Sequence, residues 1–221
     1  MNINVPNLIG QTRYNVSGGR VISDGNGDYR SGFKDSFNDS AIDNNWTEEL
    51  NNVANSITET SELSIIQSGG IANVPRLYTT PFNGINNNID VRVFMQLGNA
   101  NQFTACKLLF ANNPPPINTI SGIAMVRDGA ALEIWAQDTG GLYQIGIAQD
   151  YIWGRVVFSG NTFRTMYSLN TLTNPPTEWT ILINRDLNGA FLPSNPVIQL
   201  EVDGWTGNEA EGIYNLFEMR Y

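Results

Sequence analysis

The chain of 221 residues contains no histidine and a single cysteine, Cys106. Without histidine, the sequence excludes Ser-His-Asp and Cys-His nucleophile systems, histidine-ligated zinc and a histidine general base. One cysteine excludes an intrachain disulfide. Because Cys106 lies in the apolar run of residues 103–108, we expect a buried and unreactive thiol. The chemistry that remains depends on carboxylates, amides, hydroxyls and aromatic rings.

Charged residues are also scarce, at 15%, and 12 Lys and Arg stand against 21 Asp and Glu. The formal net charge of −9 argues against nucleic acid as a partner, because phosphate binding needs clustered Lys and Arg. The same charge disfavours binding to an anionic membrane surface. Asn, Ser, Thr and Gln supply most of the polar surface instead, which suits turns and hydrogen bonds to neutral ligands.

No stretch of the sequence has the length and hydrophobicity of a membrane span. The first six residues, Met-Asn-Ile-Asn-Val-Pro, have neither the basic segment nor the apolar stretch of a secretory signal peptide. We therefore expect a protein that is made in a host cytoplasm and reaches the outside by lysis or within an assembled particle.

Hydrophobic residues make up 41% of the chain, which is typical of a globular protein. They alternate with polar residues over residues 90–97, 179–183, 198–202 and 213–221, and this period of two indicates half-buried strands. Gly-, Asn- and Pro-rich turn signals separate the strands, so the pattern predicts an all-β sandwich. The one helix that the sequence favours is short, over residues 47–56, with Asn45 as its N-cap.

Residues 1–31 differ from the rest. They are rich in Gly and Asn and show only a brief strand-like patch at residues 20–22. We interpret them as an N-terminal arm or docking extension in front of a domain of residues 32–221. The alternative is a disordered leader, although the many apolar residues of this segment argue against it.

Residues 33–46 read F-K-D-S-F-N-D-S-A-I-D-N-N-W, and residues 212–221 read G-I-Y-N-L-F-E-M-R-Y. The first stretch resembles the opening of concanavalin A-like, laminin-G-like jelly rolls, which occur in many carbohydrate-binding modules and laminarinase-type glycoside hydrolases. The second resembles their final strand, which pairs beside the first. The resemblance covers residues 32–221 and implies a two-sheet antiparallel jelly-roll sandwich with an N-terminal extension.

The laminarinase-type hydrolases carry E-(I/L)-D-x-x-E on one strand, where two carboxylates act as nucleophile and acid/base. The nearest match here is E-I-W-A-Q-D at residues 133–138. Glu133 fits the first position, but Trp135 replaces the middle acid and Asp138 lies five residues after Glu133. On a regular strand these two carboxylates face opposite ways, so we expect no catalytic pair and no enzyme.

The face of this strand that carries Trp135 could instead bind a ligand. Neutral sugars are held by aromatic rings and by hydrogen bonds from amides and charged groups. The candidate ligand-binding residues are Trp135, Gln137, Tyr143, Trp153 and Arg155. The alternative is that these large side chains belong to the packed core, which any sandwich requires.

Calcium is the one cofactor that the sequence offers, because it prefers clustered oxygen ligands. Asp24, Asn26 and Asp28 alternate with glycines and present three side-chain oxygens. In the resembling family, calcium often lies near the first and last strands, which makes Asp35 and Asp203 candidates for a second site. A polar turn is the alternative at both places.

Together these features favour a non-enzymatic surface protein of a bacteriophage virion, such as a capsid decoration, head-fibre or tail-associated protein. Its lectin-like jelly roll would contact other virion proteins or further copies of itself, and a host-surface glycan. A chain with no recognisable leader, few lysines and a fold used in extracellular recognition points this way. The alternatives are a bacterial carbohydrate-binding module or a glycoside hydrolase on the same fold.

Overall fold

The structure is a computed structural model that describes residues 12–14, 20–23, 29–69, 73–79, 88–98, 103–112, 119–138, 141–159, 162–186, 196–205 and 208–220. These ranges contain seventeen strands and no helix, so the predicted all-β fold is confirmed. None of the described segments forms a helix able to cross a membrane. The strands are β1 (Thr12–Tyr14), β2 (Arg20–Ser23), β3 (Tyr29–Asp35), β4 (Trp46–Glu49), β5 (Ser56–Glu59), β6 (Leu63–Gln67), β7 (Arg76–Thr79), β8 (Asn88–Leu97), β9 (Phe103–Asn112), β10 (Thr119–Asp128), β11 (Ala131–Asp138), β12 (Gly141–Ile147), β13 (Tyr151–Ser159), β14 (Thr162–Ser168), β15 (Thr180–Asp186), β16 (Pro196–Asp203) and β17 (Ala210–Arg220).

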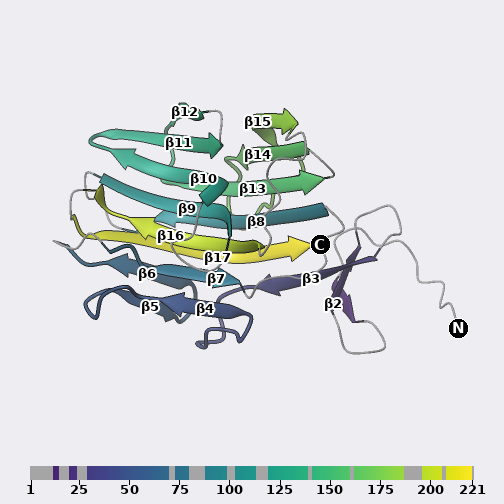
Figure 1. The fold of residues 1–221 in the computed structure, drawn as a ribbon, viewed down its shortest axis with the longest axis horizontal. Helices are drawn as coiled ribbons and strands as arrows, with labels where there is room; N and C mark the ends of the chain where they lie inside the picture. Colours follow the sequence, from purple (N-terminus) through teal and green to yellow (C-terminus); the bar gives the residue numbers. More distant parts are fainter. Residues whose placement is uncertain are drawn as a thin grey trace, which may run out of the picture.

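The strands form two antiparallel sheets (Figure 1). The ten-stranded sheet has the order β1-β2-β3-β17-β8-β13-β14-β15, with β6 also paired to β17 and β5 paired to β6. The seven-stranded sheet has the order β12-β11-β10-β9-β16-β7-β4. Strands adjacent in space often come from distant parts of the chain, as expected for a jelly-roll sandwich.

The core lies between the two sheets and follows the alternation seen in the sequence. Every second residue of β8 is fully or almost fully buried, including Val91 and Val93. In β16, Ile198 and Leu200 point into the core, but all residues from 196 to 202 are buried. The predicted half-buried strand is therefore confirmed in β8, whereas β16 is a strand that is buried on both faces. Cys106 is also fully buried, as expected, and burial raises the pKa of its thiol far above the usual range.

Strand β17 departs from the uniform alternation that the sequence predicts. Its inward residues are Gly212 and Tyr214 in the first half but Phe217 and Met219 in the second. The switch occurs at a bulge opposite β8, where Leu216 adopts a left-handed φ of 48°. One extra residue in a strand exchanges the two faces beyond it.

The sequence motif of residues 33–46 builds an aromatic cluster that joins the first and last strands of the domain. Trp46 lies 4.8 Å from Phe217 and 5.4 Å from Phe33, measured between ring centroids. The Asp35 carboxylate accepts hydrogen bonds from the Trp46 indole and the Phe37 backbone N–H, each at 2.8 Å. Residues 32–35 pair with β17, which confirms the predicted neighbourhood of the two strands.

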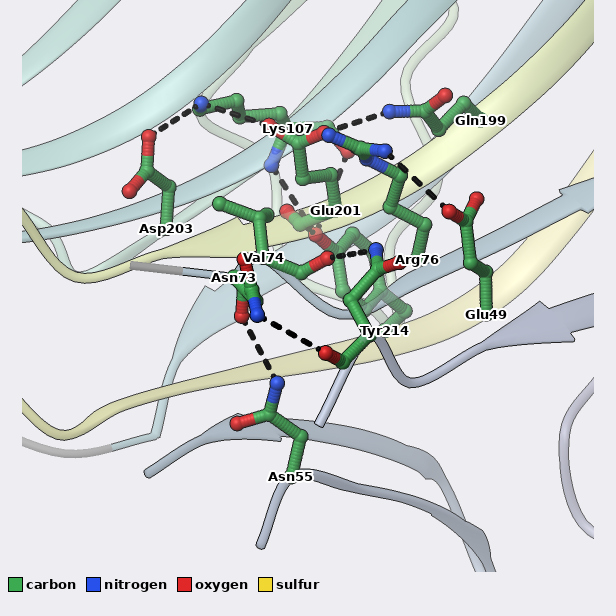
Figure 2. Close-up of polar contacts among 11 residues, drawn as sticks. Glu49, Asn55, Asn73, Val74, Arg76, Lys107, Gln199, Glu201, Asp203 and Tyr214 are labelled. Carbon is green, nitrogen blue, oxygen red and sulfur yellow. Dashed lines mark hydrogen bonds and ion pairs between the residues drawn. The ribbon is translucent and has the colours of Figure 1, made fainter. Parts of the chain in front are cut away.

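The helix predicted for residues 47–56 is wrong. Strand β4 pairs with β7 instead, and Asn51, in the turn that follows β4, has a left-handed φ of 58°. The Asn55 side chain donates one hydrogen bond to the Leu50 carbonyl and one to the Asn73 carbonyl (Figure 2). Asparagine competes with the helical backbone in this way, so the segment forms a turn between two strands.

Strand β3 crosses the boundary between the arm and the domain that the sequence suggests at residue 31. Residues 29–31 pair with β2, whereas residues 32–35 pair with β17. Strands β1 and β2 therefore continue the ten-stranded sheet past β3, and neither of them pairs with a strand of residues 36–220 among those described. The division into an arm and a jelly roll stays a prediction.

Candidate ligand-binding groove

A groove of about 240 Å³ lies on the outer face of the seven-stranded sheet. Cys106, Leu108 and Phe110 of β9 point into the core, so the alternate residues of this strand point outward. The groove is lined by residues of β9, β10, β11, β12 and β16 and by the loop after β16: Ala105, Lys107, Leu109, Gly122, Ile123, Ala124, Val126, Trp135, Gln137, Leu142, Glu201 and Trp205.

The floor of the groove is low because its central side chains are small. Ala105, Gly122 and Ala124 occupy neighbouring positions on β9 and β10. At Gly122, a Cβ atom would lie 2.5 Å from the Leu108 carbonyl oxygen, so only glycine fits there. The hollow is thus a property of the sheet surface itself.

Two tryptophans form one wall of the groove. The rings of Trp135 on β11 and Trp205 in the loop after β16 lie 4.8 Å apart with an interplanar angle of 32°. The Trp135 indole N–H donates to the Glu133 carboxylate, which shares its face of β11. Trp205 is positioned by a turn in which Gly204 N–H donates to Gln67 at 2.6 Å. Both rings are partly exposed. The hydrogen bond to Glu133 holds the Trp135 ring, and the turn at Gly204 holds the Trp205 ring.

A row of alternating charges crosses the other side of the groove (Figure 2). The Lys107 ammonium lies 2.8 Å from carboxylate oxygens of both Glu201 and Asp203. Arg76 lies 3.0 Å from Glu201 and 3.7 Å from Glu49. Burial disfavours the charged form of Lys107, but the two carboxylates outweigh this effect and raise its pKa. Glu201 is largely buried between its two cations, so it is a structural carboxylate.

Tyr214 supports this row from the opposite sheet. Its hydroxyl accepts a hydrogen bond from the Lys107 backbone N–H at 3.0 Å and donates one to the Glu201 carbonyl at 2.6 Å. The side chain is fully buried, and burial raises the pKa of the phenol. The contact fixes β9 and β16 against β17 directly beneath the groove.

Trp135 and Gln137 are the only two of the five predicted ligand-binding residues that the structure brings into the groove. Tyr143 of β12 pairs with Ala136, whose side chain lies in the core, so it faces the opposite side of the sheet. Its hydroxyl accepts a hydrogen bond from Arg185 at 3.3 Å. The expectation that Tyr143 shares a surface with Trp135 is wrong.

Trp153 and Arg155 lie on the other sheet, so their assignment to one site with Trp135 is also wrong. Trp153 is fully buried, packs against Phe94 at 5.5 Å and donates its indole N–H to the Thr171 carbonyl. Arg155 makes two hydrogen bonds of 2.8 Å to Asp90. Alternation on β13 directs Ile152 and Val156 into the core and places Trp153 and Arg155 on the outer face.

The described residues hold no group of three or more His, Cys, Asp or Glu side chains that could bind a metal. Asp24, Asn26 and Asp28 lie outside the described residues. Asp35 is occupied by Phe37 and Trp46 in the ten-stranded sheet, whereas Asp203 pairs with Lys107 in the other. The structure therefore does not bring Asp35 and Asp203 into one calcium site.

The sequence analysis missed Trp205, Lys107 and Glu201. Alternation does place Lys107 and Glu201 on the outward faces of their strands. It cannot show that β9 pairs with β16, which brings the two side chains together across 94 positions of sequence. Trp205 follows an Asp-Gly turn and carries no periodic signal.

No family model matches the chain, and no curated protein matches it. Among solved structures, the chain is similar to the CBM2 module of the evolved Dit of Lactobacillus casei BL23 phage J-1, with 11% identity and a TM-score of 0.58 over 84% of this chain and 94% of that one. It is also similar to the carbohydrate recognition domain of Emp47p, with 12% identity and a TM-score of 0.56 over 86% of this chain and 94% of that one.

A third similar structure is the GH43 protein BlXynB of Bacillus licheniformis, with 11% identity and a TM-score of 0.58. The match covers 95% of this chain but only 46% of that one. At such identities the likeness is one of fold alone. The chain has the jelly-roll sandwich that is found in carbohydrate-binding and lectin-like domains.

Proposed function

We propose that the protein is a non-catalytic, glycan-binding jelly roll and that the groove is its binding surface. The observation that carries the proposal is the Trp135–Trp205 wall beside a floor of small residues on an open sheet face. Sugar rings pack their apolar C–H faces against aromatic rings, and their hydroxyls take hydrogen bonds from a few placed polar groups.

The polar groups of the groove suit this role. Gln137 is exposed beside Trp135 and offers both a donor and an acceptor. The Lys107 ammonium is a further donor on the far side of the floor. A volume of about 240 Å³ falls below the roughly 300–1,000 Å³ of deep ligand pockets. It therefore fits one or two sugar rings at a time, bound from the open side.

The carboxylates near the groove support binding rather than hydrolysis. Glycoside hydrolysis needs two carboxyl groups roughly 5–9.5 Å apart on either side of the scissile bond. Glu133 accepts the Trp135 indole N–H, and Glu201 is held by Lys107 and Arg76. Neither arrangement leaves an acid and a nucleophile that face one another.

The test is a glycan array, followed by isothermal titration of the best-bound glycan against Trp135→Ala and Trp205→Ala. Loss of one stacking platform should cost on the order of 1–3 kcal/mol, by analogy with base stacking, which is roughly a fivefold to 150-fold loss of affinity. Trp179→Ala is the matched control, because Trp179 packs on Arg155 at the other sheet. Unchanged affinity in both groove variants would rule out this surface.

We further propose that the domain belongs to a bacteriophage virion, as a capsid decoration, head-fibre or tail-associated protein. The likeness in fold to a module of a phage Dit protein of similar length supports this location, as does the surface poor in lysine. Mass spectrometry of purified particles and the neighbouring genes test it. Polysaccharide-utilisation genes in place of portal, capsid and tail genes would favour a bacterial carbohydrate-binding module instead.

A further inference from the structure

Strand β12 forms one edge of the seven-stranded sheet, at the top of Figure 1. Among the described strands it pairs with β11 alone. Its first six residues are all exposed, so its outer row of backbone N–H and C=O groups faces solvent. Such a row is a ready template for another strand.

The side chains of β12 do not protect this edge. Seven large hydrophobic side chains are exposed in the described part of the chain, and three of them lie here: Leu142 at 48%, Tyr143 at 40% and Ile145 at 38%. The strand reads G-L-Y-Q-I-G-I and contains no charge and no proline, the two residue classes that usually guard an edge.

Two other edge strands, β4 and β15, contrast with β12. At the far end of the same sheet, β4 carries two glutamates among its four residues. At one edge of the ten-stranded sheet, β15 carries Arg185 and Asp186. Of these three edge strands, only β12 has no charged residue, and β12 also has the most exposed apolar side chains. Arg185, which reaches the Tyr143 hydroxyl, is itself neutralised by Asp138 at 3.0 Å.

We propose that β12 pairs antiparallel with β12 of a second copy of this chain, joining two seven-stranded sheets into one. Each copy carries a formal charge of −9, so most contacts between copies set like charges against each other. The β12 edge is an uncharged strip on which two copies meet without this repulsion. The self-pairing is supported further by the order of its side chains.

An antiparallel pair centred on Gln144 is complementary. Tyr143 then lies opposite Ile145 of the second copy, and this aromatic–β-branched contact occurs twice. Leu142 lies opposite Gly146, which leaves room for it, and the two Gln144 amides face each other. In an antiparallel pair, opposite residues share a face of the sheet. Gln144 shares its face with Trp135, so both grooves open on the same side of the continuous sheet.

This arrangement makes the dimer bivalent toward a glycan-bearing surface. The bivalency rests on the proposed glycan binding, whereas the strand pairing does not depend on it. Two grooves on one face engage a repeated glycan together, which raises the apparent affinity without a new contact. The interface is a single strand pair of seven residues, so we expect an equilibrium of monomer and dimer that depends on concentration.

The register is tested by disulfide cross-linking of Gln144→Cys. Directly opposite Cα atoms in an antiparallel pair are about 4.5–5.5 Å apart, within the roughly 4.4–6.8 Å that a disulfide spans. The natural Cys106 is buried and does not compete. We expect a covalent dimer under mild oxidation. Val53→Cys is the matched control, because Val53 is fully exposed in the loop between β4 and β5, away from β12. This variant should stay monomeric.

The equilibrium is tested by sedimentation velocity over a range of concentrations. Wild type should dimerise, and Ile145→Lys should shift the transition at least tenfold upward in concentration, whereas Val53→Lys should not. A wild type that stays monomeric at its highest soluble concentration, or Gln144→Cys that cross-links no more than Val53→Cys, would overturn the proposal. So would a dimer that Ile145→Lys leaves unchanged. The glycan affinity of Trp205→Ala is measured separately. It tests the proposed function of the groove and does not bear on the dimer.

Discussion

Glu133 and Asp138 project from opposite faces of strand β11. Glu133 lies on the outer face, where it accepts the Trp135 indole N–H. Asp138 is buried on the inner face and forms an ion pair with Arg185 at 3.0 Å. The sheet separates the two carboxylates, so they cannot act together on one glycosidic bond.

We therefore predict that the purified protein releases no reducing sugar from laminarin or lichenan. The measurement is a reducing-sugar assay on wild type and on Glu133→Gln, which should give the same baseline. Sugar release by wild type that disappears in Glu133→Gln would show that Glu133 is catalytic after all.

Trp153→Ala should lower the free energy of unfolding by roughly 3–5 kcal/mol, the usual cost of removing a large buried aromatic side chain. Trp153 is fully buried and packs on Phe94. Urea unfolding followed by circular dichroism measures the loss. Trp135→Ala, which removes a partly exposed ring, should cost clearly less. Equal losses in the two variants would contradict the assignment of Trp153 to structure and Trp135 to the surface.

Stability should fall as the pH rises between about 4.5 and about 7 because of Glu59. Burial raises the pKa of this carboxyl from its usual 4.5 to about 7, and the neighbouring Asp39 carboxyl adds to the effect. Within this window the folded protein holds a proton that the unfolded chain has lost, so deprotonation costs stability. Thermal melts at pH 5 and pH 8 should show the lower melting temperature at pH 8.

Glu59→Gln isolates this effect. The amide keeps an oxygen to accept the Asp39 backbone N–H but cannot ionise. The variant should be more stable than wild type at pH 8 and should lose part of the pH dependence. Burial also raises the pKa of Asp35, so this residue too lowers stability as the pH rises. Asp35 is present in both wild type and Glu59→Gln, so it does not affect the comparison. If Glu59→Gln has the same dependence of melting temperature on pH as wild type, then ionisation of Glu59 costs the folded protein little stability.

Lys107→Met should destabilise the fold by about 1–3 kcal/mol, the usual range for leaving partly buried polar groups without a partner. The substitution keeps the apolar stem and removes the charge that links Glu201 to Asp203. Lys34→Met is the matched control, because Lys34 pairs with Glu218 at 3.1 Å while Arg92 still neutralises that carboxylate. Urea unfolding should give the larger loss for Lys107→Met.

A protein that begins at Ser31 should still unfold in one cooperative transition. Residues 32–35 of β3, which pair with β17, and the Phe33–Trp46 contact remain in it, while β1 and β2 are lost. If the residues 1–31 form a docking arm, this variant should fail to join its assembly. An unfolded variant would show that the first strands are part of the domain.

The sequence predicts the fold well where alternation is regular and where a local motif has a local cause. The alternation over β8 and the aromatic motif around Asp35 both appear in the structure as expected. The alternation fails at Leu216, where a bulge exchanges the faces of β17. The helix predicted after Asn45 fails because pairing of β4 with the distant β7 outweighs the local signal.

The candidate site is less predictable, because it depends on which strands lie side by side. Trp135 and Gln137 share a strand and a face, so their proximity follows from spacing alone. The grouping with Tyr143 and Trp153 fails, because Tyr143 points to the other face of its sheet and β13 belongs to the other sheet. Trp205 reaches Trp135 only through the order of β16, β9, β10 and β11.

The place of β17 in the ten-stranded sheet also governs how the chain can fold. This strand lies between β8 on one edge and β3 and β6 on the other, and all three precede it in the chain. Arg92 and Glu218, which form an ion pair between β8 and β17, are 126 positions apart. Such distant contacts make folding slow, on the order of milliseconds to seconds. A nascent chain therefore presents the open edge of β8 until β17 has been synthesised, and this edge is where a chaperone would be needed most.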